Sequence, residues 1–171
     1  VALFRCGSTV FDPRLGRRRC QGLKRKRKEK VEMRFKDKAA LITGGGRGIG
    51  ATTAWLMLAE GARVGIVDVS EANMKKAVQT ARSRGFDLKI FVGDVSKKDS
   101  VERFMADFVK EFGRIDILVN NAGIVISRPF LEKTVEDWVK TLEVNLIGVF
   151  LCSQAAAKYM LAQKSGKIIN I

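Results

Sequence analysis

The chain has 171 residues, 46% of them hydrophobic, a length and composition that suit one domain with its own core. Its formal net charge is +14, yet residues 1–32 hold 11 Lys and Arg against 3 acids, so the remainder is only mildly basic. Three scattered cysteines and no histidine exclude a disulfide framework and a Cys/His zinc site, so no metal is expected.

Residues 1–34 are predicted to form a basic, disordered tail, and residues 35–171 the folded domain. The runs 17–19 and 24–28 carry repelling like charges and show no apolar period. A nucleic-acid arm, a nuclear signal and a transit peptide are the functional alternatives. The segment could also be non-native, because the chain starts with Val1 while Met33 opens the patterned part. No nucleic-acid partner is expected.

From residue 38 onward, short apolar or β-branched runs alternate with amphipathic stretches. This alternation predicts strands joined by helices and a parallel sheet covered on both faces. Right-handed crossovers then give a doubly wound α/β sheet, the Rossmann fold, in which the first strand lies beside the fourth and a ligand binds at that switch point. The predicted strands are 39–43, 63–68, 88–92, 115–120 and 167–171, and the predicted helices are 48–60, 71–84, 98–112 and 134–163.

A glycine-rich turn, residues 43–50 (TGGGRGIG), follows the first strand and opens the first helix. Glycines allow a tight turn and close approach to the backbone, while the free amides of a helix N-terminus attract a pyrophosphate. Taken alone, the turn could also be a plain glycine-rich connection. The residues expected to bind a dinucleotide here are Gly44, Gly46, Arg47, Gly48, Ile49 and Gly50.

Asp68 ends the second predicted strand. An acid at this place can accept hydrogen bonds from an adenosine ribose and repels a 2′-phosphate, so NAD is favoured over NADP. Arg47 and Arg63 argue the other way, because either could help to neutralise a 2′-phosphate. Asp68 could instead be a solvated strand-end acid or the N-cap of the next helix, a place for which Ser70 competes.

Two further motifs stand at the ends of the third and fourth strands, Gly93-Asp94-Val95-Ser96 and Asn120-Asn121-Ala122-Gly123. With the glycine turn they follow the order and intervals of the classical short-chain dehydrogenase/reductase family, which the chain resembles from residue 38 to 171. The resemblance implies that Asp94 and Val95 contact the adenine. It also implies that Asn121, Ala122 and Gly123 lie at the cofactor and steady the sheet. From the residues alone, the two asparagines could equally form a strand-end turn.

The predicted helix 134–163 is expected to bend near Asn145, because a mid-helix Asn competes for backbone hydrogen bonds. The resemblance implies that Asn145 holds a water of the proton relay, and that the full-length protein is a homo-oligomer, a dimer or tetramer. Core positions are predicted by the helical spacing of Trp138, Leu142, Leu146 and Val149. The apolar runs are too short or too interrupted to span a bilayer, so a cytoplasmic protein without membrane contact is expected.

The family's catalytic residues are a Ser, a Tyr and a Lys four positions after the Tyr. Tyr159, the single tyrosine, is followed at that spacing by Gln163, and Lys164 lies about 140° away round a helix. Tyr159 is therefore expected to be an amphipathic residue at the helix surface. The chain is expected to hold the cofactor-binding part of an enzyme, to end before the catalytic residues and to be inactive by itself.

The resemblance implies an oxidoreductase (EC 1.1.1.-) that transfers a hydride between a nicotinamide and a small secondary alcohol or ketone. A 3-oxoacyl thioester, a sugar and a small ketone all remain open as substrates. A non-catalytic dinucleotide-binding or sensing protein is the alternative. A Rossmann methyltransferase is disfavoured by residues 120–123 and Asn145, and a nucleic-acid binder would depend on the basic tail.

Overall fold

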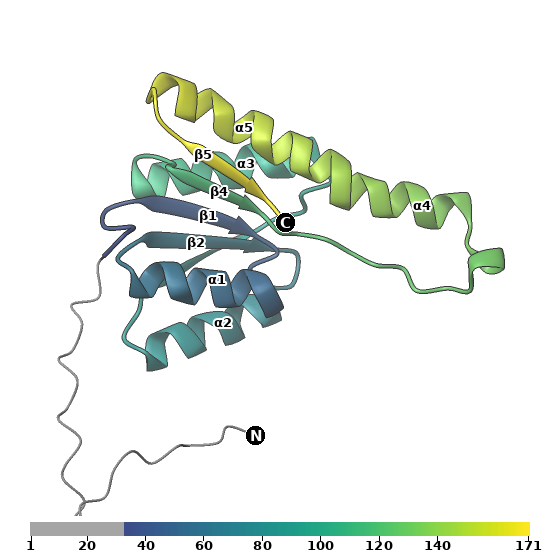
Figure 1. Ribbon diagram of the computed structural model, residues 1–171, viewed down its shortest axis with the longest axis horizontal. Coiled ribbons are helices and arrows are strands. Elements are labelled where there is room, and N and C mark those ends of the chain that lie inside the picture. The colour runs from purple at the N-terminus through teal and green to yellow at the C-terminus, as the bar shows by residue number, and fades with distance from the viewer. Residues whose placement is uncertain (1–32) are drawn as a thin grey trace, which may run out of the picture. The chain divides into compact units, whose positions relative to one another are not determined.

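A computed structural model describes residues 33–171, and the predicted tail lies outside these residues up to position 32. Strands and helices alternate along this part of the chain, as expected (Figure 1). The strands are β1 (Ala39–Thr43), β2 (Arg63–Asp68), β3 (Leu88–Val92), β4 (Ile117–Asn120) and β5 (Lys167–Asn170). The helices are α1 (Gly48–Ala59), α2 (Glu71–Ser83), α3 (Lys98–Phe112), α4 (Val135–Leu142) and α5 (Gly148–Ala162), with a 3-10 turn η1 (Phe130–Glu132) and a π-helical turn η2 (Glu143–Ile147).

The five strands form one parallel sheet in the order β3-β2-β1-β4-β5, which confirms the predicted doubly wound fold. Ile42 in the middle of the sheet lies beside Ile66 of β2 and Val119 of β4. All five strands run in the same direction, so their carboxyl ends share one edge of the sheet. The chain leaves β1 toward β2 on one side and reaches β4 on the other, which opens a crevice at that edge.

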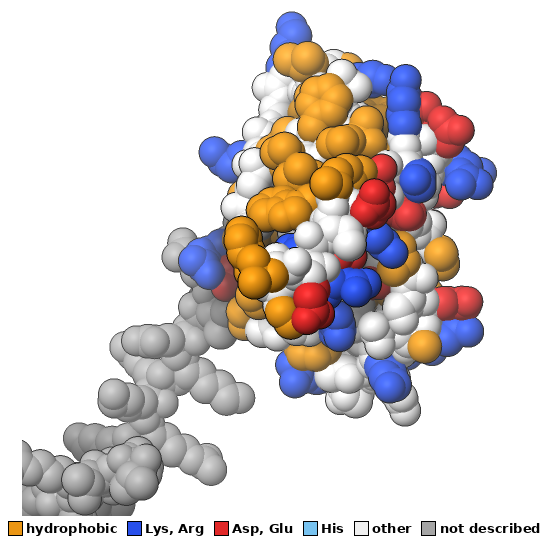
Figure 2. Space-filling view, turned by 90° about the vertical axis from the view of Figure 1, so that its right-hand side faces the viewer, with side chains coloured by type: hydrophobic (Ala, Val, Ile, Leu, Met, Phe, Trp, Pro, Cys, Tyr) orange, Lys and Arg blue, Asp and Glu red, His pale blue; other side chains and the backbone are white. Residues whose placement is uncertain are grey.

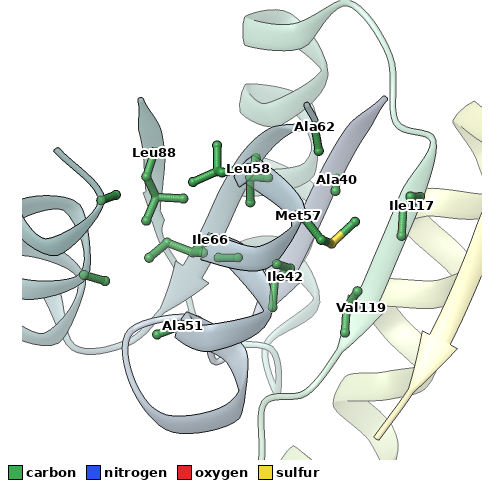
Figure 3. Close-up of a cluster of buried hydrophobic side chains, with 14 of the residues drawn as sticks. Ala40, Ile42, Ala51, Met57, Leu58, Ala62, Ile66, Leu88, Ile117 and Val119 are labelled. Atoms are coloured by element: carbon green, nitrogen blue, oxygen red, sulfur yellow. The ribbon is translucent and has the colours of Figure 1, made fainter. Parts of the chain in front are cut away.

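Helices cover both faces of the sheet, α1 and α2 on one face and α3 and α5 on the other (Figure 1). Successive side chains of a strand point to opposite faces, so Ala40 and Ile42 of β1 join the first cluster while Ala39 and Leu41 join the second. Figure 3 shows the first cluster, with Met57 of α1 beside Ile42 of β1 and directed toward Ile117 and Val119 of β4. Both faces of β1 are fully buried, as a central strand of a parallel sheet requires.

Where a bend was predicted near Asn145, the structure has the π-helical turn η2, which joins α4 to α5 without a break in the helical path. Pi-helical turns insert one extra residue into a helix and are frequent at functional sites. The helix starts at a capping box in which the Thr134 hydroxyl accepts from the Asp137 amide at 3.2 Å. The 3-10 turn η1 before it was not expected.

The outer face of α4 and α5 differs from the prediction. Trp138, Leu142 and Leu146, predicted as core, are 53%, 42% and 62% exposed. Figure 2, viewed from the side of α4, shows hydrophobic side chains gathered in a band across this face. The spacing correctly identified an apolar helix face, but the sheet covers a different face of the same helix, through Cys152 and Ala156 of α5.

Val135–Ala162 is long and apolar enough to cross a membrane by length and composition, the one such helix among residues 33–171. The expectation that no stretch meets this criterion was wrong. Within the fold, α5 packs on the sheet through residues of the second core cluster. The apolar composition therefore combines a face buried in the core with the exposed face described above.

Candidate functional site

The glycine-rich turn carries the chain from the carboxyl end of β1 into α1. Gly44 and Gly48 adopt φ values of +63° and +56°, which an L-residue with a side chain rarely adopts. The Gly45 amide donates to Val67 O at 3.1 Å, which joins the turn to β2. The N-cap residue of α1 is Arg47, whose side chain makes no capping bond. The first amides of α1 therefore lie at an uncapped helix N-terminus, where an anion binds favourably.

Asn121 holds the turn from the side of β4. Its Nδ2 donates to Thr43 O at 3.0 Å and to Gly44 O at 3.1 Å. The Thr43 hydroxyl accepts from the amides of Asn121 and Ala122, both at 3.1 Å. A Cβ on Gly44 would lie 2.8 Å from Ala122 Cα, and one on Gly50 would lie 2.5 Å from Gly44 O. These glycines are thus required by close contacts between backbone segments.

Asp68 faces the turn from the carboxyl end of β2. Its Oδ2 accepts from the Gly46 amide at 3.1 Å, and its Oδ1 accepts from the Ser70 amide at 2.9 Å. Ser70, not Asp68, is the N-cap of α2, since its hydroxyl accepts from the Asn73 amide at 3.3 Å. Asp68 is therefore neither a solvated acid nor a cap, and its carboxylate lies between the glycine turn and the start of α2.

Asp94 follows β3 at the same edge of the sheet. Its Oδ1 accepts from the Ser96 amide at 2.9 Å and from the Ser96 hydroxyl at 2.7 Å, while its own amide donates to Ser100 Oγ. Val95 beside it is 6% exposed and packs in the second core cluster. The Asp94 carboxylate is thus fixed in direction, with Oδ2 left for a ligand as far as the described contacts extend.

These segments surround one groove of about 510 Å³ at the carboxyl ends of the strands. Ten of the twelve predicted cofactor residues line it, namely Gly44, Arg47, Gly48, Ile49, Asp68, Asp94, Val95, Asn121, Ala122 and Gly123. The two that do not line it are Gly46, which faces Asp68, and Gly50, which faces Gly44 and Asn121. Both contribute to the shape of the turn, and their assignment as cofactor-binding residues stays a prediction.

Eight other residues that line the groove were not predicted as site residues: Val67, Val69, Ser70, Asn73, Gly93, Ile124, Lys140 and Val144. Ser70 and Asn73 belong to the capped start of α2, and their proximity to Asp68 was the available signal. Lys140 and Val144 are four residues apart on the helix after β4 and so share one of its faces. Their approach to the groove depends on the path of the loop 121–134. A hydrophobic period in the sequence predicts helices and strands but not the path of a loop.

Asn145 lies beside the groove, and both polar atoms of its side chain are hydrogen-bonded to the backbone of Ile124. Its Oδ1 accepts from Ile124 N at 2.9 Å and its Nδ2 donates to Ile124 O at 3.0 Å. Gly123 lies against this pair, with its Cβ position 3.5 Å from Asn145 Oδ1. Asn145 therefore ties the loop after β4 to the π-helical turn, and its amide group is held by protein atoms.

Of the two arginines considered for a 2′-phosphate, Arg47 alone lines the groove. Arg63 begins β2, at the opposite end of the strand from Asp68, and donates to Phe112 O at 3.1 Å. Its guanidinium also lies 5.8 Å from the centre of the Phe112 ring. The suggestion that Arg63 could neutralise a phosphate at Asp68 was wrong, because Arg63 lies at the amino end of β2 and Asp68 at its carboxyl end.

Tyr159 and Gln163 lie far from the groove along α5. The Gln163 side chain accepts from Ile115 N at 3.0 Å and donates to Ile115 O at 2.8 Å, just before β4 begins. Tyr159, one turn earlier, is half-buried against the second core cluster. The single tyrosine is therefore at the amino end of the strands, opposite the groove.

Residues 33–171 contain no group of three His, Cys, Asp or Glu side chains that could hold a metal ion. Cys152 is buried in the core, and burial raises the pKa of its thiol to about 12. A thiol so protonated is a poor nucleophile and a poor metal ligand. The charged side chains that line the groove are therefore two carboxylates, Asp68 and Asp94, and two cations, Arg47 and Lys140.

Known proteins are similar to this chain in sequence and in fold. The model of the short chain dehydrogenase family matches residues 38–171. An uncharacterized oxidoreductase of Thermotoga maritima is 42% identical over 139 residues, which are 81% of this chain and 55% of that protein. An NAD+-bound xylitol dehydrogenase superposes with a TM-score of 0.76 and 31% identity, over 80% of this chain and 53% of that one.

A gluconate 5-dehydrogenase from Burkholderia cenocepacia, solved with NADP and tartrate, is 40% identical with a TM-score of 0.73, over 82% of this chain and 55% of that one. The chain spans about half the length of the curated relatives it matches. The family match covers the sheet, all five helices and every segment that lines the groove. This chain belongs to the short-chain dehydrogenase family.

Proposed function

We propose that the groove binds a nicotinamide dinucleotide, as the cofactor site of an oxidoreductase that acts on a small secondary alcohol or ketone. The observation that supports this most is the convergence of an uncapped helix N-terminus, Asp68 and Asp94 on one groove. Such a groove matches, in order, the needs of a pyrophosphate, a ribose and an adenine. The position at Gly48, where a Cβ would meet no atom within 4 Å, leaves space for a ligand at the helix start.

Each part of the site has a role in this proposal. The amides of residues 48–50 hold the pyrophosphate, the Asp68 carboxylate accepts from the adenosine ribose, and Asp94 with Val95 contacts the adenine. Asn121, Ala122 and Gly123 line the groove toward the nicotinamide half, where the absence of large side chains suits a flat ring. Asn145 orders this segment through Ile124, and a relay water would be held near it.

We propose NAD as the preferred cofactor, because the Asp68 carboxylate would repel a 2′-phosphate, whereas Arg47, at the glycine-rich turn, is the arginine of the groove that could offset that charge. The 171-residue chain should therefore bind NADH at least about tenfold more tightly than NADPH, a difference of about 1.4 kcal/mol. Isothermal titration calorimetry of both cofactors, at one ionic strength, measures this directly. Equal affinities, or tighter NADPH binding, would show that Arg47 outweighs Asp68.

The bound cofactor would supply or accept the hydride, and the chain's own part is to bind and orient it. Acid–base catalysis in the family requires a Tyr and a Lys four residues later, a pair that this sequence does not contain. Tyr159 lies at the amino ends of the strands, whereas the groove lies at their carboxyl ends. We therefore propose that the 171-residue chain binds cofactor without turning over a substrate. The same groove supports a second candidate, a cytoplasmic protein that binds or senses a dinucleotide without catalysis.

We also propose that the apolar face of α4 and α5 pairs with a second copy of the chain. Contiguous exposed apolar patches above a few hundred Å² mark interaction sites, and a long apolar helix face can pair with itself about a twofold axis. Leu146 (62% exposed) lies on this face, while Leu56 (61% exposed) lies on α1.

Leu146→Glu should therefore convert a dimer to a monomer in sedimentation velocity, because a charge buried at the interface has no partner. Leu56→Glu introduces the same charge at equal exposure and should leave the dimer intact. A monomeric wild-type chain, or a dimer that both variants break equally, would refute this interface.

A further inference from the structure

Gly46 is the one glycine of the turn at which the space that a Cβ would fill is occupied by a carboxylate, that of Asp68 from β2. A Cβ on Gly46 would lie 2.8 Å from Asp68 Oδ2 and 2.9 Å from Asn73 Cβ. Both distances are below any that real Cβ atoms adopt. Because Gly46 has no side chain, the Asp68 carboxylate can lie against its backbone, with Asn73 next to the same position.

At this position the Asp68 carboxylate bridges two backbone segments, the glycine-rich turn and the start of α2. Oδ2 accepts from the Gly46 amide at 3.1 Å and Oδ1 from the Ser70 amide at 2.9 Å. The neighbouring Gly45 amide is bound to Val67 O, so consecutive amides of the turn are both held by the end of β2. Hydrogen bonds to an ionised acceptor are roughly twice as strong as neutral ones.

The turn is thus held from two sides by side chains of other strands. Asn121 of the β4 end binds the carbonyls of Thr43 and Gly44, and Asp68 of the β2 end binds the amide of Gly46. A carboxylate has about four acceptor sites, so two hydrogen bonds to the protein still leave room for ribose hydroxyls. Ordering the turn and binding a ribose are therefore compatible in one side chain.

We propose that Asp68 is a positioning residue for the glycine-rich turn: the carboxylate that would select NAD also orders, through Gly46, the turn that would hold the pyrophosphate. The first half of this statement rests on the proposed function and the second half does not. As a consequence, neutralising Asp68 does not produce an NADP-binding protein, because it also loosens the turn on which either cofactor depends.

The test uses Asp68→Asn in the 171-residue chain. Its side chain offers one oxygen where two amides need acceptors, and its own NH2 then faces an N–H. Without cofactor, the Gly46 and Ser70 amides should exchange with solvent at least about tenfold faster than in the wild type, by NMR-detected hydrogen exchange. The amides of β1 should keep their rates, which distinguishes loss of the bridge from general destabilisation. Asp87→Asn, an acid exposed by 75% in the turn before β3, is the matched control and should change neither amide.

Cofactor titration supplies the second readout. Asp68→Asn should weaken NADH binding by about tenfold or more and should not raise NADPH affinity to the level of NADH in the wild type. Unchanged exchange of the Gly46 amide would overturn the proposal, as would an Asp68→Asn variant that binds NADPH as tightly as the wild type binds NADH. If the wild type binds neither cofactor, the proposed function fails, and the exchange of Gly46 in the free protein still decides whether Asp68 orders the turn.

Discussion

Gly50→Ala should weaken NADH binding by at least about 100-fold, equivalent to about 2.7 kcal/mol. The added methyl group would lie 2.5 Å from Gly44 O and 2.6 Å from Asn121 Nδ2, so backbone as well as side chain must move. That movement separates α1 from the turn and breaks the contact between Asn121 and the turn's carbonyls. Overpacking of this kind costs about 1–3 kcal/mol of stability in addition. Fluorescence titration with NADH, combined with urea unfolding, separates the two effects.

Gly85→Ala is the control for this variant. Gly85 has φ +80° in the turn after α2, and a Cβ there would meet no atom within 4 Å. An alanine at positive φ costs about 1–2 kcal/mol of stability, so the control is destabilised without touching the groove. It should bind NADH as the wild type does. If Gly50→Ala binds NADH normally, the pyrophosphate does not lie at this helix start.

Asp116→Asn should destabilise the fold by about 1–3 kcal/mol at neutral pH. Asp116 is 4% exposed and precedes β4. It accepts from Arg114 through both oxygens, at 2.9 and 2.6 Å, and from the Ala39 amide at 2.9 Å. Burial raises its pKa, but the hydrogen bonds from Arg114 and Ala39 and the charges of Arg114 and Lys38 outweigh this, so the net pKa is lowered.

A carboxyl whose pKa is lower in the folded state stabilises the fold fully above its unfolded pKa of about 3.9. This contribution disappears as the pH falls through the lower, folded pKa. Urea unfolding of the wild type and of Asp116→Asn should therefore differ most near pH 7 and converge toward pH 2. Asp87→Asn, at an exposed ion pair with Lys89, should change stability by less than about 0.5 kcal/mol. A difference between Asp116→Asn and the wild type that is constant across this range would contradict the account.

Much of the fold follows from local patterns in the sequence. Strands β1, β2 and β3 and helix α3 begin and end at the predicted residues, because buried β-branched runs and an amphipathic period have clear limits. The strand order followed from the alternation of strands and helices with right-handed crossovers. Strand β4 starts at Ile117, two residues later than expected, although the Asp116 amide already donates to Ala39 O at 2.9 Å.

Contacts between distant residues were not predictable in the same way. The hydrogen bond between the Gly46 amide and Asp68, which lies on another strand, was not predicted. The bend at Asn145 was predicted from poor helix propensity, whereas its two bonds to Ile124 depend on the path of a loop. Trp138 and Leu146 were predicted as core because an apolar period identifies a face of a helix and not what covers it.

The central claim is that a nicotinamide dinucleotide binds in the groove at the carboxyl ends of β1, β2, β3 and β4. The most direct test is a titration of NADH into the 15N-labelled 171-residue chain, followed amide by amide. We expect saturable shifts that concentrate in residues 44–50, 68–70, 93–95 and 121–124, with β5 and the far end of α5 unaffected. Saturation without shifts in the glycine-rich turn, or no shifts at millimolar NADH, would contradict the account.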